Sequence, residues 1–358
     1  MTRARAIALA GLILLPSCRD TASPEPSIVS QHVVDAGPLV KRVDVVLLEP
    51  GAVRVTYGPP EERLEVESEG PSTSHSLVLT RLLPGVTYEY EVRAASDIAT
   101  GAFGTDDLPA DLAAVTFRAT GDPTEPLTLL EFFRLQGSAA YAGVAIVDRA
   151  GRVVWYFPAT RAITGSTRRA NGNFVFLDVT RGLLEVTSSG DVVAVLAQDD
   201  DRTLHHEVIA VPGDVLYALR LDRKTVLDTV VAGEAIWEWN PATGTEVRRW
   251  SSFDVLDPVA DRGSTYSPGD WLHANSLSVG PRGNVVVSLH HLDQIISIAP
   301  GFGALEWRLA GTNATIPLSL SDRSPASTRR QRSRPAACSC STTASSAANR
   351  TRAASSWS

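Results

Sequence analysis

Five of the seven histidines in the chain gather in three short stretches, each where a polar loop meets an apolar run. An imidazole changes charge near neutral pH, so it can accept a proton, donate one, attack an electrophile or bind an anion. One loop histidine alone would more often bond only to its neighbours. Three comparable positions on a rigid β scaffold instead indicate a shared site. The stretches are His205-His206-Glu207, Asp270-Trp271-Leu272-His273-Ala274-Asn275 and His290-His291-Leu292-Asp293.

The elements that must position these histidines are short β strands. Apolar runs closed by glycine turns pair along the chain, for example 143–148 with 151–157 and 172–178 with 182–186. Four-strand units that recur at roughly forty residues are typical of a β-propeller. We therefore predict propeller blades over 121–323. Large aromatics usually fill the space between blades, so Trp155, Trp237, Trp239, Trp250 and Trp307 are expected in the core, with Trp271 as the exception.

A different β module is expected ahead of the propeller, over 38–120. Short alternating runs there are separated by turns every eight to twelve residues, which favours a β-sandwich. The phrase from Leu83 to Val92 resembles the penultimate strand of fibronectin type III-like domains. His75 lies in a polar Ser/Thr stretch and is expected to be a solvated edge residue. This module is assigned a structural role.

The first eighteen residues have the pattern of a secretory signal. Arg3 and Arg5 precede an apolar run of about ten residues, too short for a bilayer span of about twenty. The segment 15–18 resembles a bacterial lipobox ending in Cys18, which would be lipidated; ordinary cleavage is the alternative. A flexible linker is expected over 19–37. The protein should then be exported and anchored by lipid in the bacterial cell envelope, in the periplasm or on the outer surface.

Several function classes lack support in the sequence. No HExxH, CxxC, P-loop or strand-framed GxGxxG is present, so no metal and no cofactor is expected. Acidic residues outnumber basic ones, 40 to 33, and a nucleic-acid partner is therefore not expected. Cys18, Cys338 and Cys340 are the only cysteines, which gives no disulfide framework.

Taken together, the motifs resemble bacterial aryl-sulfate sulfotransferases that use no nucleotide sulfate donor. The resemblance covers about 80 to 320, and the joint order of its phrases is more specific than any one of them. It implies an all-β fold, in which a fibronectin type III-like β-sandwich precedes a six-bladed β-propeller with the active site at its central channel. The matching phrases are His205-His206-Glu207, the run from Asp270 to Ser276, the run from Gly283 to Ser288, and Ala304-Leu305-Glu306-Trp307-Arg308-Leu309.

The resemblance also implies a reaction. A sulfuryl group would pass from a phenolic sulfate to a phenol through a sulfohistidine intermediate, with a loose transition state whose charge is spread over oxygens. By position, His206 and His273 would be catalytic, binding sulfate oxygens or protonating the leaving phenoxide. His205, His290, Asn275 and Asp270 would bind substrate. Phenolic sulfates and phenols are the expected small-molecule partners, and a homodimer is left open.

Two departures from the family pattern bear on activity. His290 stands where the family tends to have an arginine, so an imidazole of variable charge replaces a permanently charged guanidinium that can donate two parallel hydrogen bonds. The family also continues after the Trp-Arg-Leu phrase into a Gln-His that resembles its covalent nucleophile and at least one further blade. Here 324–358 is rich in Ser, Ala, Arg and Thr and lacks acids.

A basic disordered tail would explain 324–358, but we favour a frameshift. If 324–328 use G+C-rich codons, starting one base earlier gives an apolar residue followed by Ala-Gly-Gln-His. The propeller would then be incomplete, with an exposed strand edge, and the chain poorly soluble and inactive. The alternatives are a non-catalytic propeller lipoprotein that binds a small ligand or protein partner, and a structural lipoprotein with incidental histidines.

Overall fold

The computed structural model describes residues 25–118, 124–132, 141–200, 202–263 and 265–318. The expected signal peptide, the lipidation at Cys18 and the aberrant tail over 324–358 lie outside the described residues. Within the described part, no helix is long and apolar enough to cross a membrane.

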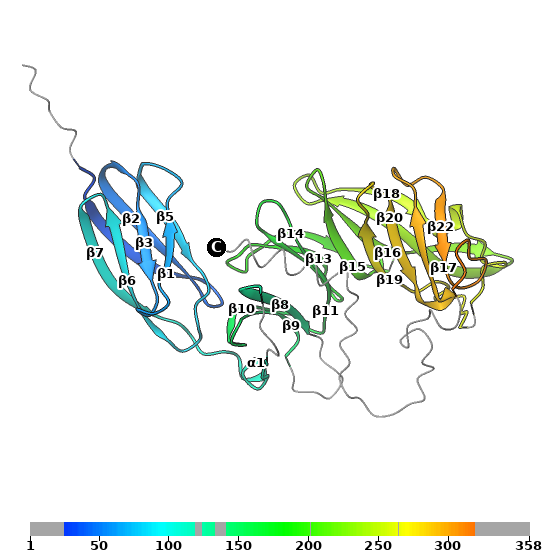
Figure 1. Ribbon diagram of the computed structural model, residues 1–358, viewed down its shortest axis with the longest axis horizontal. Helices are drawn as coiled ribbons and strands as arrows, with labels where there is room; N and C mark the ends of the chain where they lie inside the picture. Colours follow the sequence, from blue (N-terminus) through cyan, green and yellow to red (C-terminus); the bar gives the residue numbers. More distant parts are fainter. Residues whose placement is uncertain (1–24, 119–123, 133–140, 201, 264, 319–358) are drawn as a thin grey trace, which may run out of the picture.

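Two antiparallel sheets form the N-terminal sandwich (Figure 1), as alternation predicted. Along β6 every second residue, from Tyr88 to Ala94, is buried against the facing sheet, which is the burial expected of a strand with one solvated face. One sheet has the order β1 (Ile28–Gly37), β2 (Val40–Gly51), β5 (Ser72–Leu79); the other has the order β4 (Leu64–Glu67), β3 (Arg54–Tyr57), β6 (Thr87–Ala94), β7 (Asp97–Gly104).

Two expectations about this region are wrong. Residues 28–37, expected in a flexible linker, form β1 and pair with β2 from Ile28↔Leu47 to Gly37↔Val40, because the Pro/Ser composition before residue 28 does not extend into the strand. His75 is buried, and its Nε2 lies 2.8 Å from the Gly51 carbonyl oxygen. It shares the inward face of β5 with Leu77 and Leu79. The alternation of side chains along the strand, rather than the polar composition of the neighbouring residues, therefore determines that His75 is buried.

Four sheets follow in the described residues, each built from strands consecutive in the chain. Their first strands, β8, β11, β15 and β19, lie next to one another in series, as blades around an axis do. The fold class expected from the sequence, an all-β chain with a sandwich ahead of propeller blades, is confirmed, with four blades in the described residues. The sheets are β8 (Leu127–Phe132), β9 (Gly143–Asp148), β10 (Val153–Pro158); β11 (Ile163–Arg168), β12 (Phe174–Asp178), β13 (Gly182–Val186), β14 (Val192–Ala197); β15 (Leu204–Val211), β16 (Val215–Val226), β17 (Thr229–Asn240), β18 (Thr245–Ser251); and β19 (Ala274–Val279), β20 (Val285–Leu289), β21 (Gln294–Ile298), β22 (Leu305–Leu309).

Helical structure in the described part is limited to short connecting turns: α1 (Ala110–Ala113), η1 (Ser252–Asp254) and η2 (His290–Leu292). The last of these carries two of the clustered histidines. Its end is fixed by Asp293, which adopts a left-handed conformation with φ 49°.

Aromatic side chains fill the space between neighbouring sheets. Trp155 is fully buried and packs on Phe174 and Phe176 of the next sheet, with ring centroids 5.3 and 6.2 Å away. Trp239 and Trp250 are also buried, as expected, whereas Trp237 and Trp307 are only partly buried. Trp271, expected outside the core, is fully buried as well and packs on Phe253, so its position beside the histidines reflects structure rather than ligand contact.

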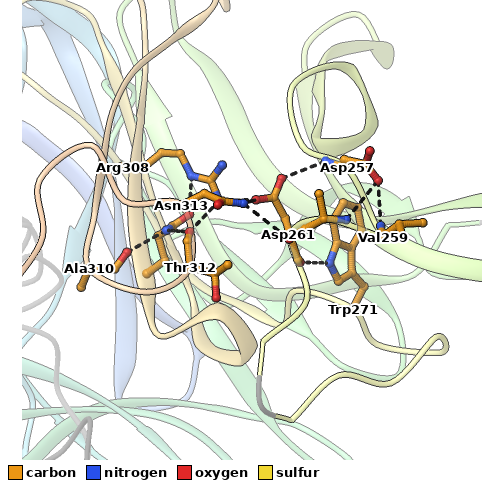
Figure 2. A network of polar contacts seen from close by, with 10 residues as sticks. Asp257, Val259, Asp261, Trp271, Arg308, Ala310, Thr312 and Asn313 are labelled. Atoms are coloured by element: carbon orange, nitrogen blue, oxygen red, sulfur yellow. Dashed lines mark hydrogen bonds and ion pairs between the residues drawn. The ribbon is translucent and has the colours of Figure 1, made fainter.

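A buried ion pair joins the last strand of the last described sheet, β22, to the loop that precedes β19 (Figure 2). Arg308 of β22 donates to the Asp261 carboxylate at 2.7 Å and to the Gln294 side-chain oxygen at 2.9 Å. Asn313 donates to the same Asp261 oxygen at 2.8 Å, and Trp271 Nε1 donates to the Asp261 carbonyl at 2.8 Å. The network therefore fixes the loop that leads into the Asp270–His273 stretch.

Candidate functional site

The histidine stretches occupy matching positions in two successive sheets. His206 lies on β15, and His273 immediately precedes β19. Both adopt left-handed backbone conformations, with φ 58° and 53°, and strand pairing is irregular beside each. Such conformations are uncommon outside glycine, Asn, Asp and His, and they cluster at functional sites. Each bend turns an imidazole away from the regular strand alternation.

A glycine in the neighbouring sheet allows the first bend to approach closely. A Cβ on Gly165 of β11 would lie 2.9 Å from the His206 carbonyl oxygen and 3.1 Å from the Val208 amide nitrogen. Any side chain at position 165 would push the two inner strands apart. The position of His206 thus depends on a backbone contact between sheets.

Glu234 of β17 holds the first histidine stretch in place. Its carboxylate is buried and accepts a hydrogen bond from His205 Nε2 at 2.9 Å and another from the Ala274 amide at 2.8 Å. The Nδ1 atoms of His205 and His206 lie 3.0 Å apart. Since His205 Nε2 carries the proton for Glu234, His205 Nδ1 accepts in the neutral ring, and His206 Nδ1 donates. This assignment leaves the lone pair of His206 on Nε2.

Asp270 plays the same orienting role for the second and third stretches. Its carboxylate accepts from His273 Nδ1 at 2.6 Å, and its main-chain carbonyl accepts from His291 Nδ1 at 2.7 Å. The main chains are joined too, because the amides of His290 and His291 donate to the carbonyls of His273 and Leu272, both at 3.1 Å. A hydrogen bond from Nδ1 leaves Nε2 of a neutral ring as the free acceptor.

These contacts bring the histidine rings into one cluster. The ring centroids of His206 and His273 lie 5.0 Å apart, and those of His273 and His291 also lie 5.0 Å apart. His290 is 5.6 Å from His273 and 5.4 Å from His291. The rings of His206 and His273, which come from two different sheets, therefore lie side by side.

The cluster is electrostatically unfavourable for added protons. Burial, together with the neighbouring His205 and His273, lowers the pKa of His206 to about 4, although Asp270 acts in the opposite direction. Partial desolvation, His273 and His291 likewise lower the pKa of His290. In the described part of the chain, the polar partners of these rings are one another, two carboxylates and a main-chain carbonyl, with no Lys or Arg among them.

The other residues singled out in the sequence have mixed positions. Asn275 lies in the irregular stretch between the Ala274 and Ser276 pairings and is exposed, with no side-chain hydrogen bond among the described residues. Its role as a substrate contact stays a prediction. Glu234 was missed by sequence reasoning; the available signal was a lone carboxylate inside the apolar stretch from Val230 to Trp237.

The same cluster offers ligands for a metal ion. Asp270, His273 and His291 each present one ligand atom, and these three atoms lie within 4.8 Å of one another. Two imidazoles and a carboxylate are a ligand set that zinc accepts. The three residues come from two loops, with His273 and His291 eighteen positions apart, so they form none of the closely spaced metal motifs.

Comparisons with solved structures give only remote similarity. A virginiamycin B lyase from Staphylococcus aureus is 10% identical, covering 78% of this chain and 82% of that chain, with a TM-score of 0.33. An auxiliary nutrient binding protein from Bacteroides ovatus is 12% identical, covering 80% and 70%, with a TM-score of 0.31. AztD from Citrobacter koseri is 12% identical, covering 79% and 95%, with a TM-score of 0.28. Scores this low carry no argument about this chain, and no curated protein matches it.

A family profile gives a specific result. The profile described as Arylsulfotransferase (ASST) matches residues 120–320, more than half of the 358-residue chain. The matched range contains the four sheets that follow the sandwich and every residue of the histidine cluster. The chain therefore belongs to the arylsulfotransferase family.

Proposed function

We propose that the histidine cluster is an aryl-sulfate pocket inherited from a sulfuryl-transfer enzyme. The observation that carries the proposal is the approach of the His206 and His273 rings, from two separate sheets, to 5.0 Å. Asp270 orients His273 directly, and Glu234 orients His206 through His205. The aryl sulfate would place its oxygens against these rings. A structural role for the histidines would not require both bends and both carboxylates.

The reaction of the family type would proceed by two displacements at sulfur. An imidazole nitrogen forms a bond to sulfur while the S–O bond to the donor aryl group breaks, and the phenoxide leaves with the electron pair and takes a proton. An acceptor phenol then loses its proton, attacks the same sulfur and releases the imidazole. Fixed donors around the equatorial oxygens would stabilise both steps.

Protonation limits how this cluster can hold a sulfate. Neutral rings whose Nδ1 is already engaged present a lone pair, so they must gain a proton before they donate to an oxyanion. An approaching anion raises the pKa of His206 and His290 and thereby promotes this uptake. Aryl-sulfate affinity should consequently increase as the pH is lowered from 8 to 6.

We also propose that this chain binds aryl sulfates without transferring the sulfuryl group at enzymatic rates. No Gln-His, expected to carry the sulfohistidine, follows the Trp-Arg-Leu phrase in the given sequence, and 324–328 reads Ser-Pro-Ala-Ser-Thr. The coding DNA tests the frameshift directly, because a codon set unable to give Gln-His in another frame would remove that explanation. Secretion and a lipid anchor at Cys18 belong to the same proposal and are tested by mass spectrometry of the membrane fraction.

The decisive experiment measures binding and turnover separately. Calorimetry with 4-nitrophenyl sulfate should show saturable binding that His273→Asn weakens, while 4-nitrophenol release with phenol as acceptor stays at background. His32→Asn is the matched control, because His32 is exposed on β1 in the sandwich. Ordinary turnover would contradict the predicted inactivity. Equal affinity for phenol and its sulfate would contradict the sulfate pocket and favour a non-catalytic binding protein.

A permanent cation should sharpen this test. His290 is exposed beside His273, so His290→Arg can place a guanidinium at the edge of the cluster without changing the core. We expect about tenfold tighter 4-nitrophenyl sulfate binding, equivalent to about 1.4 kcal/mol. The gain should be smaller at pH 6, where the wild-type rings take up protons more readily.

A further inference from the structure

We propose that Asp270, His273 and His291 form a binding site for a divalent first-row transition metal ion such as Zn²⁺. The observation behind it is that one ligand atom from each lies within 4.8 Å of the other two, from an oxygen donor and two imidazoles. This inference does not depend on aryl-sulfate binding. It departs from the expectation, drawn from sequence motifs, that the chain holds no metal.

The hydrogen bonds around the site prepare its ligands. His291 Nδ1 donates to the Asp270 carbonyl at 2.7 Å, so Nε2 of the neutral ring carries the lone pair that a metal requires. Metal-ligating histidines usually donate their other ring nitrogen to a carbonyl or carboxylate, and that contact sets both tautomer and ring orientation. His291 has this arrangement without any rearrangement of its backbone.

Asp270 and His273 would ligate the ion through the two atoms that are now hydrogen-bonded to each other. His273 Nδ1 donates to the Asp270 carboxylate at 2.6 Å, and transfer of that proton to Nε2, which gives the other tautomer of the neutral ring, would free both atoms for the ion. The side chains of Asp270 and His273 are 38% and 34% exposed, so an ion can reach them from solvent and they can adjust. Zinc bonds of 2.0–2.2 Å place tetrahedral ligand atoms about 3.3 Å apart, and modest side-chain rotation closes the difference.

The backbone beneath the ligands is held firmly. The two segments are tied by the amides of His290 and His291, which donate to the His273 and Leu272 carbonyls. Gly263 packs so closely that a Cβ there would overlap the His291 carbonyl oxygen at 1.6 Å. Trp271, one residue after Asp270, is fully buried and hydrogen-bonded to the Asp261 carbonyl. Metal sites on such restrained backbones lose little freedom on binding.

Charge also favours a cation at this position. Asp270 and Glu234 supply two carboxylates to the cluster, and the described polar partners of its rings include no Lys or Arg. Three protein ligands leave one position of a tetrahedral zinc site open. The ring of His206 lies 5.0 Å from that of His273, close to the proposed site.

The test is a titration of the full chain with Zn²⁺ after removal of metal by a chelator. Calorimetry should show one saturable site per chain. His291→Asn keeps a donor for the Asp270 carbonyl but removes the ring nitrogen, and it should abolish that site. Asp270→Asn should weaken binding by about 10–100-fold.

Two matched variants should bind as the wild type does. His32→Ala removes an exposed histidine of the sandwich. Cys338→Ser/Cys340→Ser removes thiols that could take up zinc on their own. Co²⁺ added in place of Zn²⁺ should give the visible absorption of a four-coordinate N/O site, and His291→Asn should lose it.

The proposal is overturned if folded wild-type protein shows no saturable Zn²⁺ binding, or if His273→Ala/His291→Asn binds with unchanged stoichiometry and affinity. Circular dichroism confirms that each variant is folded. The sulfate pocket is judged separately, from 4-nitrophenyl sulfate binding in the presence of chelator. Either result can therefore fail without the other.

Discussion

Trp271 connects two polar networks that differ in kind, because its side chain donates to the Asp261 carbonyl and its main chain follows Asp270. The Asp261–Arg308 network on one side is built from permanent charges, with side chains only 6% and 12% exposed (Figure 2). The histidine cluster on the other side holds groups of variable charge, and His273 is 34% exposed. The first network has a partner for each charge, whereas the second presents lone pairs to solvent.

The pKa values of the two networks show the same difference. Burial opposes ionisation of Asp261, but hydrogen bonds from Arg308 and Asn313 outweigh it, so its pKa is lowered and the pair stays charged. In the cluster, burial and neighbouring imidazoles act in the same direction and hold His206 neutral. A site that keeps acceptors available to a ligand is expected to look like the second network.

The largest effect should come from breaking the charged network. Asp261→Ala leaves Arg308 buried without its carboxylate, and removing one partner of a buried pair costs about 3–5 kcal/mol. We expect that loss in the free energy of unfolding from urea titration. The matched control is Arg282→Ala, whose pair with Glu306 is exposed on the Arg282 side, and it should cost about 0–1 kcal/mol.

Equal losses from Asp261→Ala and Arg282→Ala would contradict the distinction between the two pairs. A second comparison uses Asn313→Ala, which removes one donor to Asp261 but leaves the ion pair. Its cost should fall between the two.

A smaller effect is expected from Glu234→Gln at the edge of the cluster. Glutamine has the size of glutamate, but only one of its two terminal atoms is an acceptor oxygen. Its side chain can still accept from the Ala274 main-chain N–H, but it then has no second oxygen to accept from His205. We expect a loss of about 1–3 kcal/mol in unfolding free energy. Imidazole ¹⁵N spectra should also show a changed tautomer for His205.

The tautomer measurement distinguishes orientation from mere packing. If Glu234 only fills space, Glu234→Gln leaves the His205 and His206 nitrogen shifts unchanged. If it orients His205, both residues respond, because their Nδ1 atoms share a hydrogen bond. Glu238→Gln is the control, since Glu238 of the same strand pairs with Arg249 away from the histidines.

The sequence predicted the scaffold well because strand alternation and glycine turns are local signals. The predicted pair 172–178 and 182–186, for instance, appears as β12 and β13 with Phe174↔Val186 and Asp178↔Gly182 in register. The histidines were found because their chemistry is visible in residue type. Their approach to 5.0 Å, however, depends on left-handed bends at His206 and His273 that local propensity does not encode.

The residues that sequence reasoning missed act through distant partners. Glu234 reads as one charged residue in a strand, and its bond to the Ala274 amide spans forty positions. His75 and Trp271 were assigned from the polarity of their neighbours, and both are buried. In each case tertiary packing decided the outcome, and composition within a short window could not.

The smallest expected effect is on the pH dependence of the free energy of unfolding, which should differ between the two networks. The folded pKa of His206, about 4, lies below its ordinary 6.5, so between these values the unfolded chain binds more protons. Stability should therefore be full above pH 6.5 and fall as pH drops towards 4, by about 1–2 kcal/mol for a half-buried ring. The lowered pKa of Asp261 affects stability only at lower pH, because its contribution is lost as pH falls below about 3.8.

Urea titrations of chelator-treated protein at pH 7.5, 5.5 and 4.5 should show the stability loss due to His206 in the wild type and in Asp261→Asn, but not in His206→Asn. A wild-type curve that stays flat until pH 4 would mean that His206 titrates normally, and the contrast between a charged network and a neutral cluster would then disappear.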